Sequence, residues 1–244
     1  MTAPTRPPTI LEAVGEATPG YRWVLLWRWP LRLTHWVSAA TIVVLIVTGL
    51  YIANPYFVTW GEASQHFLMG WARFLHFTAA ALIVAAAILR VYWLFAGSKW
   101  ASWQALLPVK KQDWKNLVKM IKYYLLVRQE QMPHYLGHHP LQQLSYTAIY
   151  AVVVVQVVTG FAMYGVANPG GFFYTMFTSW VQPLFGGLQV VRFWHHALTW
   201  ILVCFIPLHI YLAFRADVVD REGELSSIFS GGRFVKSDVR FEDE

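Results

Sequence analysis

Charged residues and cysteine are scarce in this sequence of 244 residues. Asp, Glu, Lys and Arg make up 13% of the chain, against about 25% in soluble domains. There is one cysteine, Cys204, and no CxxC or CxxCH motif, which disfavours disulfides, thiolate zinc sites and covalently attached haem. Apolar residues make up 57% of the chain. Although the net charge of +6 could suit a nucleic acid, this composition indicates an integral membrane protein.

Four apolar segments are long enough to cross a membrane as helices. A spanning helix needs about 20 mostly apolar residues, because its backbone must satisfy its own hydrogen bonds in lipid. None of the four contains Asp or Glu. We therefore expect an all-α, integral membrane four-helix bundle within a domain of residues 21–234, with spans at about 33–56, 74–97, 144–167 and 193–214.

The segments outside the spans have distinct compositions. Residues 1–20 are rich in Pro and Thr, which predicts a flexible N-terminus that is not cleaved. Residues 103–129 combine lysines with apolar residues and predict an amphipathic helix on the membrane surface, or else an ordinary solvated helix. Residues 235–244 are expected to form a C-terminal tail.

The distribution of cations predicts the orientation. With four spans, both termini and the 98–143 loop share one side of the membrane. Only Arg73 and Arg192 of the 19 Lys and Arg residues fall on the other side, which leaves 17 with the termini. The positive-inside rule places both termini in the cytoplasm of a bacterium and the opposite loops in the periplasm.

Histidines lie at the ends of three of the four spans. Coordinating groups within spans are costly and are therefore candidates for function. In the fourth span, His209 is 14 residues from His195 and 13 from His196. At about 100° per residue, His195 lies about 40° from His209 around the helix, whereas His196 lies about 140° away. His195 is therefore the predicted partner, about 21 Å along the helix, and His196 is predicted to face elsewhere.

The depth of each histidine predicts two pairs. His76 opens the second span at the periplasmic side, at the level of His195. His35 opens the first span at the cytoplasmic side, at the level of His209. We expect an outer pair, His76/His195, and an inner pair, His35/His209.

Arginine and glycine residues near these histidines suggest further contacts with a bulky ligand. Arg32, Arg73 and Arg192 each precede a histidine by three residues, so each shares its helix face and could bind the carboxylate tails of a cofactor. Gly49 and Gly160 belong to a weak echo, VTGLYIANP and VTGFAMYGVANP, and could allow close approach of the ligand. The simpler explanations are that arginine commonly marks the end of a membrane span and that glycine commonly lies at contacts between helices.

Two opposed imidazoles suit a haem iron held on both axial sides. Zinc would need a third or fourth ligand, and the spans hold no carboxylate. We therefore predict two b-type haems. A membrane transporter that handles metal ions or protons through these histidines is the alternative of a different class.

The sequence resembles the cytochrome b subunits of membrane-bound [NiFe] hydrogenases. The resemblance covers about residues 27–234 through RLTHW, TGLYIANP, RFLHF, RVYWLFAG, LGHHPLQ, TGFAMYG, RFWHHALTW and HIYLAFRAD. It implies that His35, His76, His195 and His209 are the axial ligands of the two haems. It further implies an electron-transfer subunit, not an enzyme alone, of a hydrogen:quinone oxidoreductase complex in the inner membrane.

In such a complex, the hydrogenase small (iron-sulfur) and large ([NiFe]) subunits would dock on the periplasmic face. Electrons would leave to membrane quinone near the cytoplasmic side, where His138, His139 and Asp217 are candidate contacts. Related cytochromes b serve formate dehydrogenases and other periplasm-facing oxidoreductases, which is the alternative for the partner.

Overall fold

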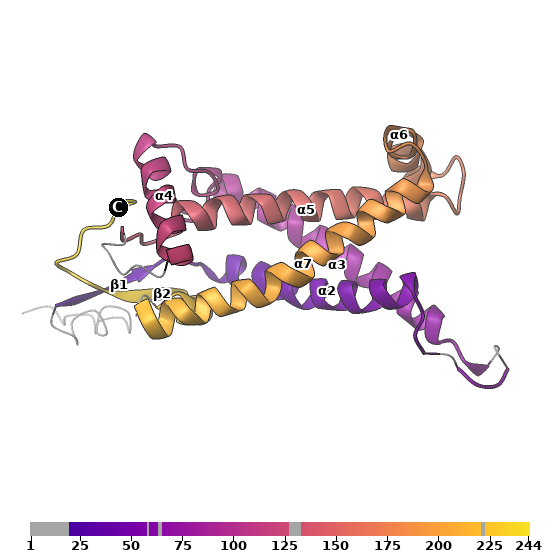
Figure 1. Ribbon diagram of the computed structural model, residues 1–244, viewed down its shortest axis with the longest axis horizontal. Helices are drawn as coiled ribbons and strands as arrows, with labels where there is room; N and C mark the ends of the chain where they lie inside the picture. Colours follow the sequence, from indigo (N-terminus) through magenta and orange to yellow (C-terminus); the bar gives the residue numbers. More distant parts are fainter. Residues whose placement is uncertain (1–19, 58, 63–64, 127–132, 221–222) are drawn as a thin grey trace, which may run out of the picture. The chain divides into compact units, whose positions relative to one another are not determined.

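Four long helices dominate the computed structural model, which describes residues 20–244 except 58, 63–64, 127–132 and 221–222. They are α2 (Trp29–Ala53), α3 (Leu68–Ala96), α5 (Pro140–Gly165) and α7 (Leu188–Arg215) (Figure 1). All four are long and apolar enough to cross a membrane. The chain is thus an integral membrane protein with a mostly helical fold.

These helices begin earlier than the expected spans. They start at residues 29, 68, 140 and 188, four to six residues before the predicted starts, whereas their ends differ by no more than three residues. The first turns include Arg and Gln, which continue a helix but do not count as apolar. In α5, Pro140 occupies the first helical position, where the missing N–H has no intrahelical partner to lose.

The long helices bury small residues and expose large ones. In α3, Ala72, Ala79 and Ala86 are buried at intervals of seven residues, so they form one stripe along which a neighbouring helix can approach closely. Large apolar side chains such as Ile88 and Leu208 are more than half exposed. Exposed apolar surface on a long helix is what a lipid environment requires.

The chain divides into two compact units. The helical unit comprises residues 33–93 and 144–209, and the terminal unit comprises the described parts of residues 1–32, 94–143 and 210–244. All four predicted haem-ligand histidines belong to the helical unit.

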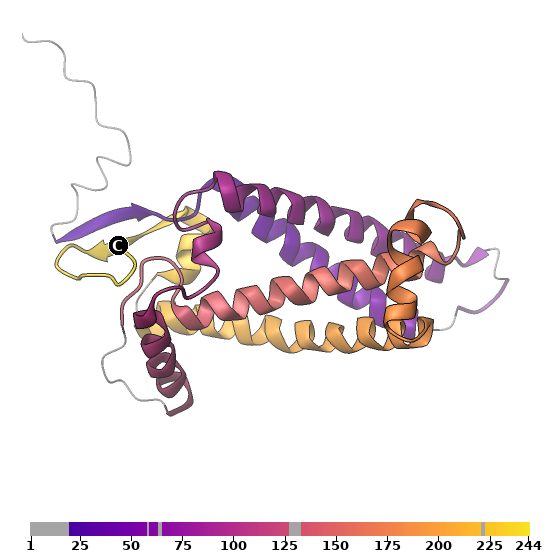
Figure 2. The same ribbon diagram turned by 90° about the horizontal axis from the view of Figure 1, so that it is seen from above.

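Within the helical unit, connected helices are antiparallel. Thr48, near the end of α2, contacts His76, near the start of α3. Thr159, near the end of α5, contacts His195, near the start of α7. The two figures show the long helices running along a common direction in this unit (Figures 1 and 2).

A short helical segment joins α5 to α7, where only a loop was expected. It consists of a π-helical turn, η3 (Tyr174–Thr178), followed by α6 (Ser179–Leu184). The Thr178 hydroxyl donates to the Ala162 carbonyl over 2.7 Å, and Val181 packs against Ala162 and Val191. One face of this segment therefore closes the end of the α5–α7 pair.

The terminal unit contains a two-stranded antiparallel sheet, which corrects the expectation of a purely α fold. Strand β1 (Tyr21–Leu25) pairs with β2 (Gly232–Lys236), with Tyr21 opposite Lys236. A side chain at Gly232 would lie 2.3 Å from the Val24 carbonyl oxygen, so this pairing requires glycine. The buried core beside the sheet is formed by Leu26, Trp27, Trp100, Leu136 and Val235.

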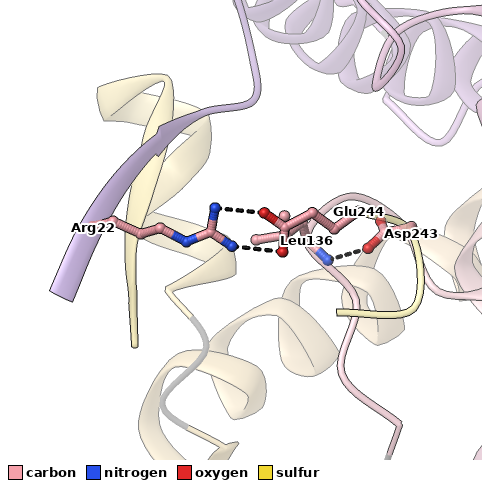
Figure 3. A network of polar contacts seen from close by, with 4 residues as sticks. All are labelled: Arg22, Leu136, Asp243 and Glu244. Carbon is pink, nitrogen blue, oxygen red and sulfur yellow. Dashed lines mark hydrogen bonds and ion pairs between the residues drawn. The ribbon is translucent and has the colours of Figure 1, made fainter. Parts of the chain in front are cut away.

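The C-terminal residues are bound to the terminal unit, so the expected boundary at residue 234 falls inside β2. The Asp243 carboxylate accepts hydrogen bonds from the backbone N–H groups of Leu136 and Gly137, over 2.7 and 2.8 Å. Glu244 forms an exposed ion pair with Arg22 at 2.5 Å. Figure 3 shows the Arg22–Glu244 ion pair beside the contact between Asp243 and Leu136.

The remaining helices also belong to the terminal unit. A 3-10 turn, η2 (Trp103–Ala105), precedes α4 (Lys111–Leu126). Helix α4 starts later than the predicted surface helix because Pro108 interrupts the segment; residues 127–129 lie outside the described residues. A π-helical turn, η4 (Ala216–Asp220), extends α7 and is followed by α8 (Glu224–Ser230).

Candidate functional site

The helical unit brings the predicted histidines together in the expected pairs. His35 and His209, from α2 and α7, have ring centroids 6.4 Å apart and ring planes inclined by 53°. His76 and His195, from α3 and α7, lie close enough to interact electrostatically. The two pairs lie towards opposite ends of α7 within this unit, as the depths of the histidines along their spans predict.

The separation of the His35/His209 pair fits a single metal ion between the rings. With metal–nitrogen bonds of about 2 Å and about 1 Å from each nitrogen to its ring centre, two imidazoles on one ion have centroids about 6 Å apart. No group of three or more His, Cys, Asp or Glu side chains that could hold a metal occurs among the described residues. Two imidazoles are a donor pair that suits the two axial sides of a haem iron.

Two aromatic rings lie beside His209 in the His35/His209 pair. Phe205 stacks on His209 with ring centroids 5.4 Å apart, and Tyr146 meets it edge-on at 6.1 Å. Nδ1 of His35 is buried and has no hydrogen-bond partner among the residues that the structure describes.

His76 has a different environment, because a threonine binds its second nitrogen. Nδ1 of His76 lies 2.9 Å from Oγ1 of Thr48. That hydroxyl donates its own hydrogen to the Val44 carbonyl, 2.6 Å away and one turn earlier in α2. The hydroxyl can thus only accept from the imidazole, which places the hydrogen on Nδ1 and leaves the Nε2 lone pair for a metal.

His195 repeats this arrangement with residues of α5. Its Nδ1 lies 2.9 Å from Oγ1 of Thr159, whose hydroxyl donates to the Val155 carbonyl over 2.6 Å. Gln156 also donates to the His195 backbone carbonyl over 3.0 Å. Neither threonine was predicted from the sequence, although both belong to the Thr-Gly pair shared by the two segments of the internal echo.

The two glycines of the echo lie against these same imidazoles. A Cβ atom at Gly49 would be 3.1 Å from Cε1 of His76, and one at Gly160 would be 3.3 Å from Cε1 of His195. We expected these glycines to admit a bulky ligand. In the structure they make room for the histidine rings that would hold it.

The other predicted residues lie apart from these contacts. His196 is exposed and its nearest ring is Trp200, so it stands on another face of α7 from His195. Arg73 and Arg192 are exposed at the starts of α3 and α7. Arg32 belongs to the terminal unit, where its guanidinium donates to the Phe229 carbonyl.

The candidate quinone contacts have structural partners in the terminal unit. His138 stacks on Trp27, and the Asp217 carboxylate accepts from the backbone N–H groups of Leu225 and Ser226 at the start of α8. His139 accepts from the Gln142 N–H at the start of α5, and burial lowers its pKa from 6.5 to about 3. His139 is therefore neutral over the physiological range.

Comparison with known proteins gives a consistent result. The profile of the prokaryotic cytochrome b561 family matches residues 26–231. A protein of Azotobacter chroococcum mcd 1 named "Probable Ni/Fe-hydrogenase B-type cytochrome subunit" is 41% identical over 218 residues, covering 88% of this chain and 90% of that protein.

Two further relatives are more distant. A protein of the same name from Bradyrhizobium diazoefficiens is 36% identical over 224 residues, covering 91% of this chain and 90% of the relative. The "Probable Ni/Fe-hydrogenase 1 B-type cytochrome subunit" of Escherichia coli K12 is 29% identical over 213 residues, covering 85% of this chain and 89% of the relative. With two histidine pairs inside an apolar helical unit and a family match over most of its length, the chain belongs to the prokaryotic cytochrome b561 family.

Proposed function

We propose that this chain is a membrane-anchoring di-haem cytochrome b that passes electrons from a periplasmic [NiFe] hydrogenase to membrane quinone. The observation that carries the proposal is the pairing of four histidines at two levels of one helical unit. The pairs are separated by about 21 Å along α7, since 14 residues rise about 1.5 Å each. One pair alone would serve a single site near one surface.

The chain's own residues supply the ligands and their surroundings. His76 and His195 would hold one iron through Nε2, and His35 and His209 would hold the other. When bound, each haem supplies one-electron transfer between ferric and ferrous iron. The apolar helices keep water and ions away from both sites. Because the chain has one cysteine, it lacks the thiolates of nickel-iron and iron-sulfur centres and would not split hydrogen by itself.

The distribution of charge supports an orientation with both termini in the cytoplasm. Of the 19 Lys and Arg residues, only Arg73 and Arg192 lie at the helix ends on the side opposite the termini. The His76/His195 pair would then lie near the periplasm, where the small and large hydrogenase subunits would dock. The His35/His209 pair would lie towards the cytoplasm, where quinone would be reduced. The names of the curated relatives support the hydrogenase as partner.

A difference spectrum of the purified protein tests the haem content. We expect reduced-minus-oxidised bands of haem b, with two haems per chain in the wild type and one in His76→Ala or His35→Ala. Protein that remains colourless after expression with ample haem contradicts the proposal, and supports a transporter instead.

Partner and orientation are tested separately. A hydrogenase small subunit should co-purify in mild detergent, whereas recovery of a formate dehydrogenase subunit would favour the alternative partner. For orientation, Cys204→Ser removes the only cysteine and gives a clean background. In that background, Arg73→Cys should react with a membrane-impermeant thiol reagent in intact cells and Lys119→Cys should not. Labelling of Lys119→Cys alone would reverse the proposed orientation.

A further inference from the structure

The two histidine pairs differ in the hydrogen bonds of their imidazole Nδ1 atoms. In the His76/His195 pair, both Nδ1 atoms lie 2.9 Å from a threonine hydroxyl. In the His35/His209 pair, Nδ1 of His35 is buried without a hydrogen-bond partner among the described residues. The His209 ring makes ring contacts with Tyr146, Phe205 and His35 itself.

Each threonine is oriented by its own helix. Thr48 and Thr159 give their hydroxyl hydrogens to the carbonyls of Val44 and Val155, both over 2.6 Å. Each hydroxyl oxygen therefore presents only lone pairs to the imidazole, and the imidazole must donate. This geometry holds the Nδ1–H tautomer, and with it an Nε2 that is free to bind a metal.

A hydrogen bond from Nδ1–H changes how strongly Nε2 donates to a metal. As the Nδ1–H proton is drawn towards an acceptor, the ring becomes a more basic ligand. A more basic ligand favours the more highly charged ferric iron over ferrous iron. Two such bonds act on one pair, and none acts on His35.

We propose that Thr48 and Thr159 are positioning residues that hold the imidazoles of His76 and His195 and make the haem at this pair the lower-potential one of the two. This inference rests on the proposed function, because it takes both pairs to be haem ligands. Electrons that enter at the His76/His195 pair would then pass to the His35/His209 pair towards higher potential.

The same helix contains a control for this contact. Thr41 lies two turns before Thr48 and is buried to a similar extent, with 6% against 8% exposure. Its hydroxyl also donates to the carbonyl four residues earlier, that of Val37, over 2.8 Å. Thr41 has no imidazole partner among the described residues. A Thr41→Val change therefore removes the same backbone contact without touching a histidine.

The experiment is a potentiometric titration of the purified full-length protein, followed by its haem absorbance. The variants are Thr48→Val, Thr159→Val and the double variant, with Thr48→Ser and Thr41→Val as controls. Loss of one hydrogen bond should shift the ferric-to-ferrous equilibrium of one haem about tenfold, which raises its midpoint by about 59 mV. The lower midpoint should rise in each Val variant and further in the double variant, and the higher midpoint should not move.

Thr48→Ser keeps the hydroxyl and should retain the wild-type potential, as should Thr41→Val. Electron paramagnetic resonance of the ferric protein should show altered low-spin g values for one haem only in the Thr48 and Thr159 Val variants. If a Val variant loses a haem outright, retention of both haems in Thr48→Ser and Thr41→Val supports the positioning role. Equal loss in Thr41→Val overturns it.

Two further outcomes overturn the inference. If both midpoints are unchanged in the double variant, the threonines do not act on the iron. If the higher midpoint rises instead, the order of the two haems is the reverse. Both outcomes leave the wild type with two haems, so they are distinct from failure of the proposed function, in which the wild type itself binds none.

Discussion

Replacing Gly49 by alanine tests how closely His76 is held against α2. The added Cβ would lie 3.1 Å from Cε1 of His76, whereas ordinary contacts begin at 3.4 Å. The imidazole must therefore move by a few tenths of an ångström. It cannot do so freely, because its Nδ1 lies 2.9 Å from the hydroxyl oxygen of Thr48, the residue next to Gly49.

The expected effect separates stability from haem binding. Straining or losing one hydrogen bond costs about 1 kcal/mol, which corresponds to about fivefold weaker haem binding at this pair. Alanine also favours the helix by about 0.5–1 kcal/mol relative to glycine. Because these two effects oppose each other, Gly49→Ala should leave the thermal stability of the haem-free protein nearly unchanged, while haem binding at one site weakens.

A haem titration of detergent-purified apoprotein, followed by absorbance, measures this. Gly70→Ala in α3 is the control, because its Cβ would meet only Phe67 at an ordinary 3.8 Å. Gly160→Ala should have a smaller effect than Gly49→Ala, since its contact with His195 is 3.3 Å. Wild-type affinity in Gly49→Ala, or equal weakening in Gly70→Ala, would refute the reasoning.

Four other predictions concern the ligands and the terminal unit. His195→Ala should lose one haem and His196→Ala should keep both, as read from the difference spectrum; the opposite result would contradict the helical-phase argument. Lowering the pH from 7 to 5 should destabilise the terminal unit by about 2 kcal/mol, because the pKa of His139 is lowered from 6.5 to about 3. The neutral form of His139 contributes its full stability above pH 6.5, and this contribution declines as the pH falls towards 3. Thermal unfolding of the wild type and of His139→Gln at both pH values measures the loss. An equal response of the two proteins would contradict this prediction. Asp243→Asn should cost about 1–3 kcal/mol in the same assay, because the carboxylate accepts two backbone N–H groups. Glu244→Gln should cause no measurable change, because its ion pair is exposed, and a marked loss of stability would show that this pair does more than its exposure allows.

The spans and the histidine pairs could be predicted because they depend on local periodicity. A membrane helix satisfies its backbone within one segment, so apolar length alone locates it. Helical phase then relates His195 to His209 within one helix. Pro207 lies inside α7, yet the two histidines still meet partners from α3 and α2 respectively. The pairing could be predicted because His195 and His209 both belong to one regular helix.

The contacts that were missed join residues far apart in the chain. Strands β1 and β2 pair across more than 200 residues, and neither segment has enough local pattern to identify its partner. Arg32 has the same R-x-x-H spacing as Arg73 and Arg192, but its guanidinium reaches Phe229. A motif defined within one helix cannot reveal an acceptor supplied by a helix 197 residues away in the sequence.

The Thr-Gly pair shows how a short sequence echo acquires a physical meaning. An imidazole that approaches a helix closely needs a position without Cβ, and its Nδ1–H needs an acceptor beside that position. Thr48-Gly49 meets both needs for the histidine of α3, and Thr159-Gly160 meets them for the histidine of α7. Because the same contact imposes the same two residues, the likeness between α2 and α5 follows from chemistry whether or not the two helices arose by duplication. Substituting the threonine or the glycine of either pair should therefore perturb the histidine that the pair contacts more than it perturbs the helix that contains the pair.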